Sequence, residues 1–391
     1  MVISIRLKNF FSLGDEVMLD FTAEKDRKNQ KDYGSQNLID FNGDKFVNII
    51  GLFGGNAAGK SNIIKAIDFC RNLVLYSHLN NEGTHFDFQP FKFREESPSE
   101  FSINFVTEGI EYEYSFQVLK DKVLSESLFY YPNKRRAHVF TRSNTTDYVF
   151  RKGSISRPAE VEANTGSQTL FISRASSMNR AIPQTVFRFF LNGIRIGTGD
   201  FDLSKTQIQA IELNKEMLLK ALEVGDSDIV DFRINEYVPG HFSIQTFHKE
   251  NPSLPFNFDK EESDGTKRLF FILLMLIQTA SADTTIFFDE FDLKLHFRLA
   301  EFLLDAVRAS GKSQLVFTSH NPALINRNSM RDEQIVFVTK LPDGQSEFVP
   351  LSDFEGANKI KDIQTAYLQG RFDGVPYLGN IQYIIKDLNK Q

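Results

Sequence analysis

The chain has 391 residues, 41% of them hydrophobic and 25% charged, which excludes a collagen-like, low-complexity or wholly disordered protein and predicts two or three structural units. Its 45 lysines and arginines stand against 51 aspartates and glutamates, and the net charge of -6 argues against a dedicated nucleic-acid-binding chain. The longest apolar run, residues 269–277, is much shorter than the roughly 20 residues of a membrane span.

The first part of the chain predicts strands, a glycine-rich loop and a helix. Residues 3–7 alternate apolar and polar side chains, as in a half-buried strand. The apolar run 46–52 predicts a second strand that ends at glycines, and apolar residues then recur at helical spacing over 63–70. Residues 101–106 and 110–118 alternate on either side of a short turn, which predicts an antiparallel hairpin.

The second part of the chain begins with a helical pattern over 164–223, which we interpret as an insertion. Strand-like alternation returns over 229–237 and 241–247. The pattern that follows predicts a helix, a buried strand, a second helix and a second buried strand, at 269–280, 285–288, 297–309 and 314–318. The last three elements form a β-α-β unit, which implies neighbouring parallel strands.

Residues 54–61 match the pattern G-x-x-x-x-G-K-[ST] between a predicted strand and a predicted helix, the context that this phosphate-binding motif requires. Small residues let backbone N–H groups surround a polyphosphate at the positive end of the helix. In this pattern Lys60 neutralises the β- and γ-phosphates and Ser61 holds Mg²⁺. The predicted nucleotide-binding residues of this segment are Gly54, Gly55, Asn56, Ala57, Ala58, Gly59, Lys60, Ser61 and Asn62.

Three other segments place polar groups at the ends of predicted elements. Asp289 and Glu290 end an apolar strand, at the edge where doubly wound sheets bind ligands. We expect Asp289 to complete the metal shell and Glu290 to orient or deprotonate the attacking water. Ser263 and Gly265 precede a helix, where they bind an anion or simply cap the helix. His320 ends the last buried strand, in position to contact a γ-phosphate.

In this order, the phosphate loop, the serine-glycine signature, the acidic strand end and the histidine resemble the motifs of ABC-type ATPases. The segments IRLKNFFS, GKSNIIKAI, DEFDLKLH and TSHNPALI resemble the branch of SMC proteins, RecF-like repair proteins and OLD nucleases. The resemblance covers nearly the full chain. DFQPFKF, LFISRASSMN and AYLQGRFDGVP, residues 366–376, resemble the shorter prokaryotic AAA-type ATP-binding proteins of phage-defence and abortive-infection operons.

The resemblance implies an α/β fold, the ABC-ATPase head of the P-loop NTPases, with a mixed sheet, an N-terminal antiparallel β subdomain and a helical insertion lobe. We expect residues 1–160 to form the N-terminal part of the head with the phosphate loop and the β subdomain. Residues 161–226 are the expected helical insertion. Residues 227–391 are the expected C-terminal part, with the signature, the acidic strand end and the switch histidine.

The resemblance also implies ATP and Mg²⁺ as cofactors. Lys60 and Ser61 bind phosphate and Mg²⁺, and Asp289 also binds Mg²⁺. By the same resemblance, Glu290 is the catalytic carboxylate and His320 the switch residue. Ser263 and Gly265 contact the γ-phosphate held by a second copy of the protein, so nucleotide binding is also dimerisation, and hydrolysis releases the clamp.

The sequence departs from the transporter pattern at two points. Ser263-Asp264-Gly265 replaces Ser-Gly-Gly, and His296 stands where a transporter has an aspartate. The glutamine expected to line the active site is Gln89 or Gln117, and the sequence does not choose between them. The residues after His320 are too few for the TOPRIM nuclease domain of OLD nucleases, so we expect no such domain.

We interpret the chain as a slow, regulatory ATPase, the sensor subunit of a prokaryotic anti-phage defence system. It would control a separate nuclease or toxin through ATP-dependent assembly into a homodimer or a higher homo-oligomer. The alternatives are a DNA-maintenance ATPase of the RecF or SMC kind and a nucleotide-locked scaffold with little turnover. DNA is a partner in the first alternative, and the basic run 134–136 is its candidate contact, although such runs are usually solvated loops.

Two features bear on the location of the protein. The first ten residues lack the apolar core and the cleavage site of a signal peptide, and Cys70 is the only cysteine. We therefore expect a cytoplasmic protein without a membrane partner.

Overall fold

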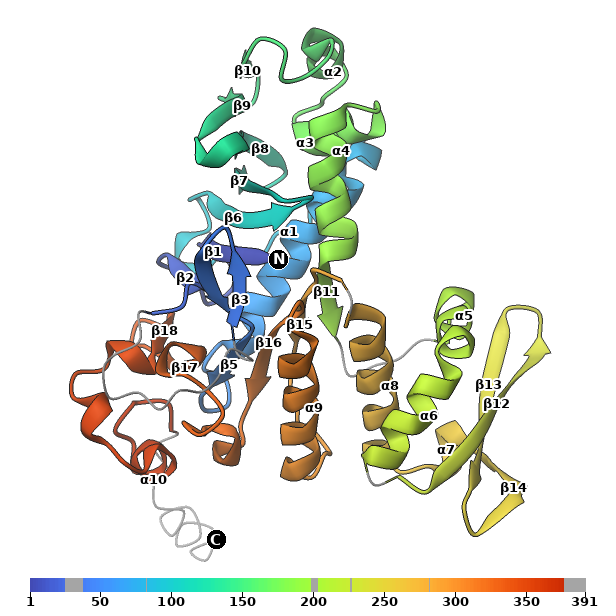
Figure 1. Cartoon of the computed structure of the whole chain (residues 1–391). Helices are drawn as coiled ribbons and strands as arrows, with labels where there is room; N and C mark the ends of the chain where they lie inside the picture. Colours follow the sequence, from blue (N-terminus) through green and yellow to red (C-terminus); the bar gives the residue numbers. More distant parts are fainter. Residues whose placement is uncertain (25–37, 82, 198–202, 226, 281, 376–391) are drawn as a thin grey trace, which may run out of the picture.

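A six-stranded mixed sheet carries the phosphate loop (Figure 1). The computed structural model describes residues 1–24, 38–81, 83–197, 203–225, 227–280 and 282–375. In spatial order the strands are β11 (Ile194–Gly197), β15 (Thr285–Phe288), β16 (Gln314–Ser319), β5 (Ile49–Phe53), β17 (Ile335–Lys340) and β18 (Ser346–Pro350). The first five run parallel, and β18 is antiparallel to β17. The predicted β-α-β unit is confirmed as β15, α9 (Phe297–Ser310) and β16.

A seven-stranded antiparallel sheet forms the β subdomain that the sequence predicts. Its spatial order is β10 (Asp147–Phe150), β9 (Ala137–Ser143), β8 (Lys122–Tyr130), β7 (Ile110–Leu119), β6 (Ser99–Thr107), β1 (Val2–Lys8) and β2 (Val17–Asp20). The predicted hairpin is confirmed as β6 and β7, with positive φ at Glu108 and Gly109 in its turn. The predicted strand 46–52 is divided, because β4 (Asp44–Val47) pairs with β3 (Leu38–Phe41) and only β5 joins the mixed sheet.

Helix α1 (Lys60–Tyr76) follows the phosphate loop and packs between the two large sheets (Figure 1). Its buried residues share one hydrophobic core with the antiparallel sheet and with Ile50 and Leu52 of β5. The alternate residues Ile49 and Phe53 belong to a second core with α8 (Asp264–Thr279) and α9. Because successive side chains of a strand point to opposite faces, β5 is buried on both sides and its carboxyl end is held in place.

The stretch predicted as helical is interrupted by a strand. Helix α2 (Pro158–Ala163) precedes this stretch, and its helices are α3 (Phe171–Ser177), α4 (Ala181–Arg188), α5 (Lys205–Leu213) and α6 (Lys215–Val224). Between α4 and α5, β11 pairs in parallel with β15, so the uninterrupted helical pattern over 164–223 was wrong there. Helices α3 and α4 contribute to the first core, whereas α5 and α6 contribute to the second. The division of the chain into three parts stays a prediction.

A smaller three-stranded sheet stands beside α6 and leads into α8 (Figure 1). Its elements are β12 (Ile229–Val238), β13 (His241–His248), β14 (Asn251–Asn257) and the short α7 (Phe258–Glu261). Helix α10 (Ile363–Leu368) follows β18. None of the helices in the described ranges has the length and apolar character needed to cross a membrane. The predicted α/β architecture, with a mixed sheet, an antiparallel subdomain and helices inserted between the strands, is confirmed.

Candidate nucleotide-binding site

The phosphate loop connects β5 to α1 and requires glycine at two places. Gly54 lies so close to β17 that a Cβ atom would stand 2.3 Å from the carbonyl oxygen of Val338. Gly59, the N-cap of α1, has φ of 104°, and a Cβ atom there would lie 1.9 Å from the Ser346 hydroxyl. Only glycine accommodates both the left-handed conformation and these contacts, so the loop backbone is fixed against β17 and β18.

Lys60 is the first residue of α1, and its ammonium group lies inside the loop. The residue is 5% exposed, and Nζ donates to the carbonyl oxygens of Gly54 (2.9 Å) and Gly55 (3.0 Å). Burial lowers the pKa of Lys60 to about 8, against the raising effect of the Asp289 and Glu290 charges. Phosphate oxygens accept stronger hydrogen bonds from an ammonium group than backbone carbonyls do, so this amine is suited to a polyphosphate ligand.

Asp289 brings two hydroxyl groups together at the end of β15. Its Oδ1 atom accepts from Ser61 Oγ (3.0 Å) and from Thr318 Oγ1 (2.6 Å). Mg²⁺ prefers oxygen ligands in octahedral geometry, in which adjacent ligands lie about 2.9 Å apart. The separation of Ser61 Oγ and Asp289 Oδ1 fits two adjacent positions of that shell. The described residues hold no group of three or more His, Cys, Asp or Glu suited to a metal, so phosphate oxygens and waters would supply the other ligands.

Glu290 follows Asp289 and projects from the same edge of the sheet. It is exposed, and its backbone has φ of 48°, in the left-handed region that few non-glycine residues adopt. Its N–H group donates to Thr318 Oγ1 at 2.7 Å, which ties this turn to the neighbouring strand β16. The unusual backbone directs the Glu290 side chain away from the core, where it is accessible to water.

Arg268 of α8 supports this turn and was missed by the sequence reasoning. The residue is 6% exposed, and its guanidinium donates to the carbonyl oxygens of Asp289 (3.3 Å), Glu290 and Phe291 (3.5 Å). The guanidinium carbon also lies 5.2 Å from the ring centroid of Phe288. Arg268 therefore links α8 to the acidic strand end. Contacts to backbone carbonyls follow no sequence pattern, so no signal could have found it.

His320 lies next to Lys60 at the end of β16. Its ring nitrogens Nδ1 and Nε2 are 3.3 and 3.1 Å from Lys60 Nζ. Burial and the Lys60 charge lower the pKa of His320, which favours a neutral ring that accepts a hydrogen bond from the ammonium group. The structure thus brings Lys60, Ser61, Asp289, Glu290 and His320 to one edge of the mixed sheet, at the carboxyl ends of β5, β15 and β16.

Ser263 and Gly265 do not join this cluster within one chain. Ser263 is exposed and caps α8, accepting from the N–H group of Thr266 at 3.0 Å. A Cβ atom at Gly265 would lie 2.8 Å from the carbonyl oxygen of Lys294, so the start of α8 packs closely on the segment after Glu290. Among the described residues, no hydrogen bond or ion pair connects Ser263 or Gly265 with the phosphate loop.

Asn62 belongs to a hydrogen-bond cluster beneath the loop. Its Nδ2 atom donates to Ser12 Oγ (2.7 Å), which bonds the Ser346 hydroxyl (2.6 Å). Ser346 also bonds the carbonyl oxygen of Ala58 at 2.6 Å. Asn56 and Ala57 form the exposed tip of the loop, with φ of 60° at Ala57. The cluster joins distant segments, which is why the sequence did not reveal Ser12 or Ser346.

The structure does not decide between the two candidate glutamines. The Gln89 carbonyl accepts from the N–H group of Phe11 (2.7 Å), next to Ser12, but its side chain donates to Asp87 (3.1 Å). Gln117 lies within β7 and pairs with residues of β6 and β8. His296 caps α9, where its Nδ1 accepts from a backbone N–H group. None of these observations assigns a catalytic part to them.

The C-terminal motif at residues 366–376 packs against the start of the phosphate loop, and its last residue lies outside the described residues. The Tyr367 hydroxyl donates to the carbonyl oxygen of Gly374 at 3.2 Å. Phe372 stacks on Phe337 of β17, with ring centroids 4.7 Å apart. A Cβ atom at Gly374 would lie 3.6 Å from Cα of Gly54. The motif therefore supports the loop from outside the sheet.

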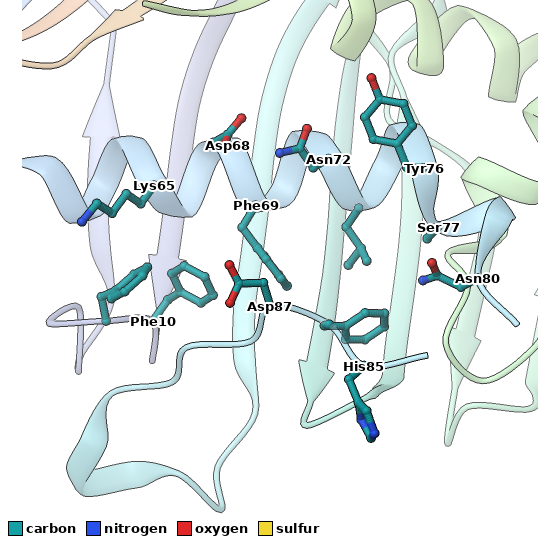
Figure 2. A pocket seen from close by; sticks show the side chains of 13 residues that line it. Phe10, Lys65, Asp68, Phe69, Asn72, Tyr76, Ser77, Asn80, His85 and Asp87 are labelled. Carbon is teal, nitrogen blue, oxygen red and sulfur yellow. The ribbon is translucent and has the colours of Figure 1, made fainter. Parts of the chain in front are cut away.

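A separate cavity of about 500 Å³ runs along the outer side of α1. Figure 2 shows Phe69 of α1 pointing to the side on which Phe10 and Asp87 lie. None of the residues lining it belongs to the predicted nucleotide site, and the ends of β15 and β16 do not reach it. Two of its walls connect it with the phosphate loop: helix α1, which begins at Lys60, and the segment that contains Phe11 and Ser12.

Comparison with known families finds a match to the sequence. The family model described as "AAA domain, putative AbiEii toxin, Type IV TA system" matches residues 49–326, a range that includes Lys60, Asp289 and His320. No curated protein matches the sequence.

Comparison with solved structures finds SMC head domains at low sequence identity. The SMC head domain from Thermotoga maritima is 14% identical, with 89% of this chain and 98% of that chain covered and a TM-score of 0.40. An SMC head from Pyrococcus furiosus, bound to a domain of ScpA, is 15% identical. The match covers 90% of this chain and 96% of that chain, with a TM-score of 0.42. An SMC head from Pyrococcus yayanosii is 13% identical. The match covers 94% of this chain and 99% of that chain, with a TM-score of 0.45.

Proposed function

The chain belongs to the family of AAA domains described as putative AbiEii toxins of type IV toxin-antitoxin systems, and from this premise we propose that it is a slow, regulatory ATPase of a prokaryotic anti-phage defence system. Its family is one of AAA-type P-loop ATPases. The observation that carries the proposal is the convergence of Lys60, Ser61, Asp289 and Glu290 at one edge of the mixed sheet.

In this proposal the residues divide the work of ATP hydrolysis. Lys60 exchanges its carbonyl partners for oxygens of the β- and γ-phosphates. Ser61 and Asp289 hold Mg²⁺, which supplies positive charge to the phosphates when bound. Glu290 orients the attacking water and accepts its proton, while the oxygen of that water bonds to the γ-phosphorus and ADP leaves. His320, already within hydrogen-bond distance of Lys60, contacts the γ-phosphate and responds to its loss.

The proposal assigns Ser263 and Gly265 to the ATP of a second copy. Ser263 is exposed at the N-terminus of α8, and its segment packs on the residues that follow Glu290. A helix N-terminus favours negative charge, and two copies related by a twofold axis would each close the other's site. ATP binding would then assemble a homodimer or a larger homo-oligomer, and hydrolysis would release it.

We further propose that this assembly controls a separate effector, a nuclease or a toxin. The support is the family description, which places related AAA domains in toxin-antitoxin systems. An ATP-dependent clamp is a two-state element, and a partner that binds only one of its states is switched by nucleotide. Duplex DNA is a second partner to test in the same assembled state.

A mixing experiment tests the shared site. Lys60→Ala lacks its own phosphate contact, and Ser263→Ala lacks the contact that it would give to a partner. Each variant alone should turn over little ATP. In an equal mixture each mixed dimer has one complete site, so the mixture should turn over more ATP than either variant does alone. A mixture as inactive as the separate variants would overturn the shared site, and full activity of Ser263→Ala alone would do the same.

A further inference from the structure

His248 joins three segments around the residue that precedes Ser263. It stands at the end of β13, and its Nδ1 atom is 2.9 Å from Asp228 Oδ1, just before β12. Its Nε2 atom is 2.7 Å from Glu262 Oε1, between α7 and α8. The ring of Phe256 from β14 packs against the imidazole, with centroids 4.6 Å apart. One side chain therefore holds the small sheet to the start of α8.

The three groups of this triad differ in burial. The Glu262 side chain is 6% exposed and that of His248 17%, whereas the Asp228 side chain is 66% exposed. Thr246 of β13 also donates its hydroxyl to Glu262. A buried carboxylate is costly unless positive charge and hydrogen bonds compensate it, and the imidazole is the cation within reach of Glu262.

Both ring nitrogens of His248 face carboxylate oxygens, so both bonds form only when each nitrogen carries a proton. Burial lowers the pKa of His248, but the hydrogen bonds and charges of Asp228 and Glu262 outweigh it and raise the pKa above its ordinary value. Among the described residues, these two carboxylates are the charged groups that bond the ring. The charged side chains of α7, which packs on β13, are exposed to solvent: Asp259, Lys260 and Glu261.

We propose that His248 is a positioning residue for the nucleotide site of the second copy, because its imidazolium holds Glu262 and thereby fixes the adjacent Ser263. This inference rests on the proposed function, in which Ser263 contacts the partner's ATP. Only Glu262 and Ser263 separate α7 from α8, so the backbone of Ser263 follows the anchored Glu262 closely. Phe258 of α7 is buried in the second core, so the other end of this short segment is fixed as well.

The consequence is a pH-dependent clamp. Below the unfolded pKa of histidine the imidazolium makes both bonds, and their contribution is fully present. As the pH rises through the raised pKa of folded His248, the ring loses one proton and one carboxylate loses its donor. ATP-dependent assembly should therefore weaken as the pH rises through the raised pKa of His248, without a matching change in nucleotide binding to the single head.

The test compares His248→Gln with His241→Gln, a control on the same strand whose histidine is exposed. Self-association is measured by sedimentation with AMP-PNP and Mg²⁺ from pH 6 to 9, and nucleotide binding by titration with a fluorescent ATP analogue at high dilution. His248→Gln should weaken association roughly tenfold at pH 6 and flatten its pH dependence, the loss expected for one charge-assisted hydrogen bond. Binding to the diluted head and the His241→Gln variant should match wild type within about twofold.

Two further variants separate the outcomes. His248→Lys keeps a positive charge across this range, so it should restore assembly and make it independent of pH. Ser263→Ala tests the proposed function itself and should abolish association. If Ser263→Ala associates like wild type, the shared site of the proposed function is wrong. If Ser263→Ala abolishes association but folded His248→Gln assembles with the wild-type pH profile, only the positioning role of His248 is wrong.

Discussion

Replacing Arg268 with methionine removes the donors that hold the turn carrying Asp289 and Glu290. The guanidinium is buried and bonds three consecutive carbonyl oxygens, of Asp289, Glu290 and Phe291. Methionine reproduces most of the unbranched aliphatic stem of arginine, but it lacks the guanidinium and donates no hydrogen bond. The substitution therefore tests hydrogen bonding more than packing.

The expected loss of stability follows from those bonds. Two of them, at 3.3 and 3.5 Å, are long and contribute little, whereas the contact with the Glu290 carbonyl is close. One good charge-assisted bond contributes about 1.5–3 kcal/mol. The loss of stability is partly offset, because methionine carries no charge and the cost of desolvating the buried guanidinium disappears. We expect Arg268→Met to lower the free energy of unfolding by about 2 kcal/mol.

The larger effect should be on turnover. Glu290 has a left-handed backbone, which persists only while neighbouring contacts hold it. A displacement of about 1 Å of a catalytic group can cost roughly a hundredfold in rate. Turnover of saturating ATP and urea unfolding are measured for Arg268→Met and for Arg298→Met, a control in the exposed first turn of α9. Arg268→Met with both values unchanged would refute the role of Arg268.

Other substitutions give further tests. Lys60→Ala should weaken ATP binding roughly a hundredfold in an equilibrium titration, because two charge-assisted bonds to phosphate are lost; binding within a few-fold of wild type would contradict the site. Gly59→Ala should abolish ATP binding, because the added Cβ atom would collide with the Ser346 hydroxyl of β18. The control Gly240→Ala is also at positive φ but in open space, so it should lower the free energy of unfolding by only about 1 kcal/mol and leave ATP binding unchanged. Glu126→Ala should lower the free energy of unfolding in urea by about 3–5 kcal/mol. The substitution leaves the buried charge of Arg142 without its carboxylate, and the N–H groups of Phe171 and Ile172 without an acceptor. A loss below about 1 kcal/mol would contradict that reasoning.

The sequence predicted those elements whose pattern is strong and local. Buried parallel strands are continuous apolar runs, and the runs before Gly54 and before Asp289 ended where the structure ends β5 and β15, give or take one residue. The order of motifs also predicted the family correctly, because each motif must follow a particular element. The fold could therefore be predicted before the structure was known, whereas the roles of the site residues, which the structure brings together at one sheet edge, stay predictions.

Other features depended on contacts between distant segments. Strand β11 is four residues long and directly follows a helical pattern, and it is a strand only because Ile194 pairs with Thr285. Arg268 acts on backbone carbonyls, which carry no side-chain signature. Ser346 reaches the phosphate loop from β18. Periodicity within one segment contains no information about such partners.

The most direct test of the account is ATP turnover, measured together with mass in solution, for wild type and Glu290→Gln with ATP and Mg²⁺. Glutamine keeps the shape of the side chain but cannot accept a proton from water. The account predicts that turnover of Glu290→Gln collapses while the ATP-bound assembly persists or increases. Unchanged turnover would contradict the role of Glu290, and loss of turnover without any ATP-dependent increase in mass in either protein would contradict the clamp.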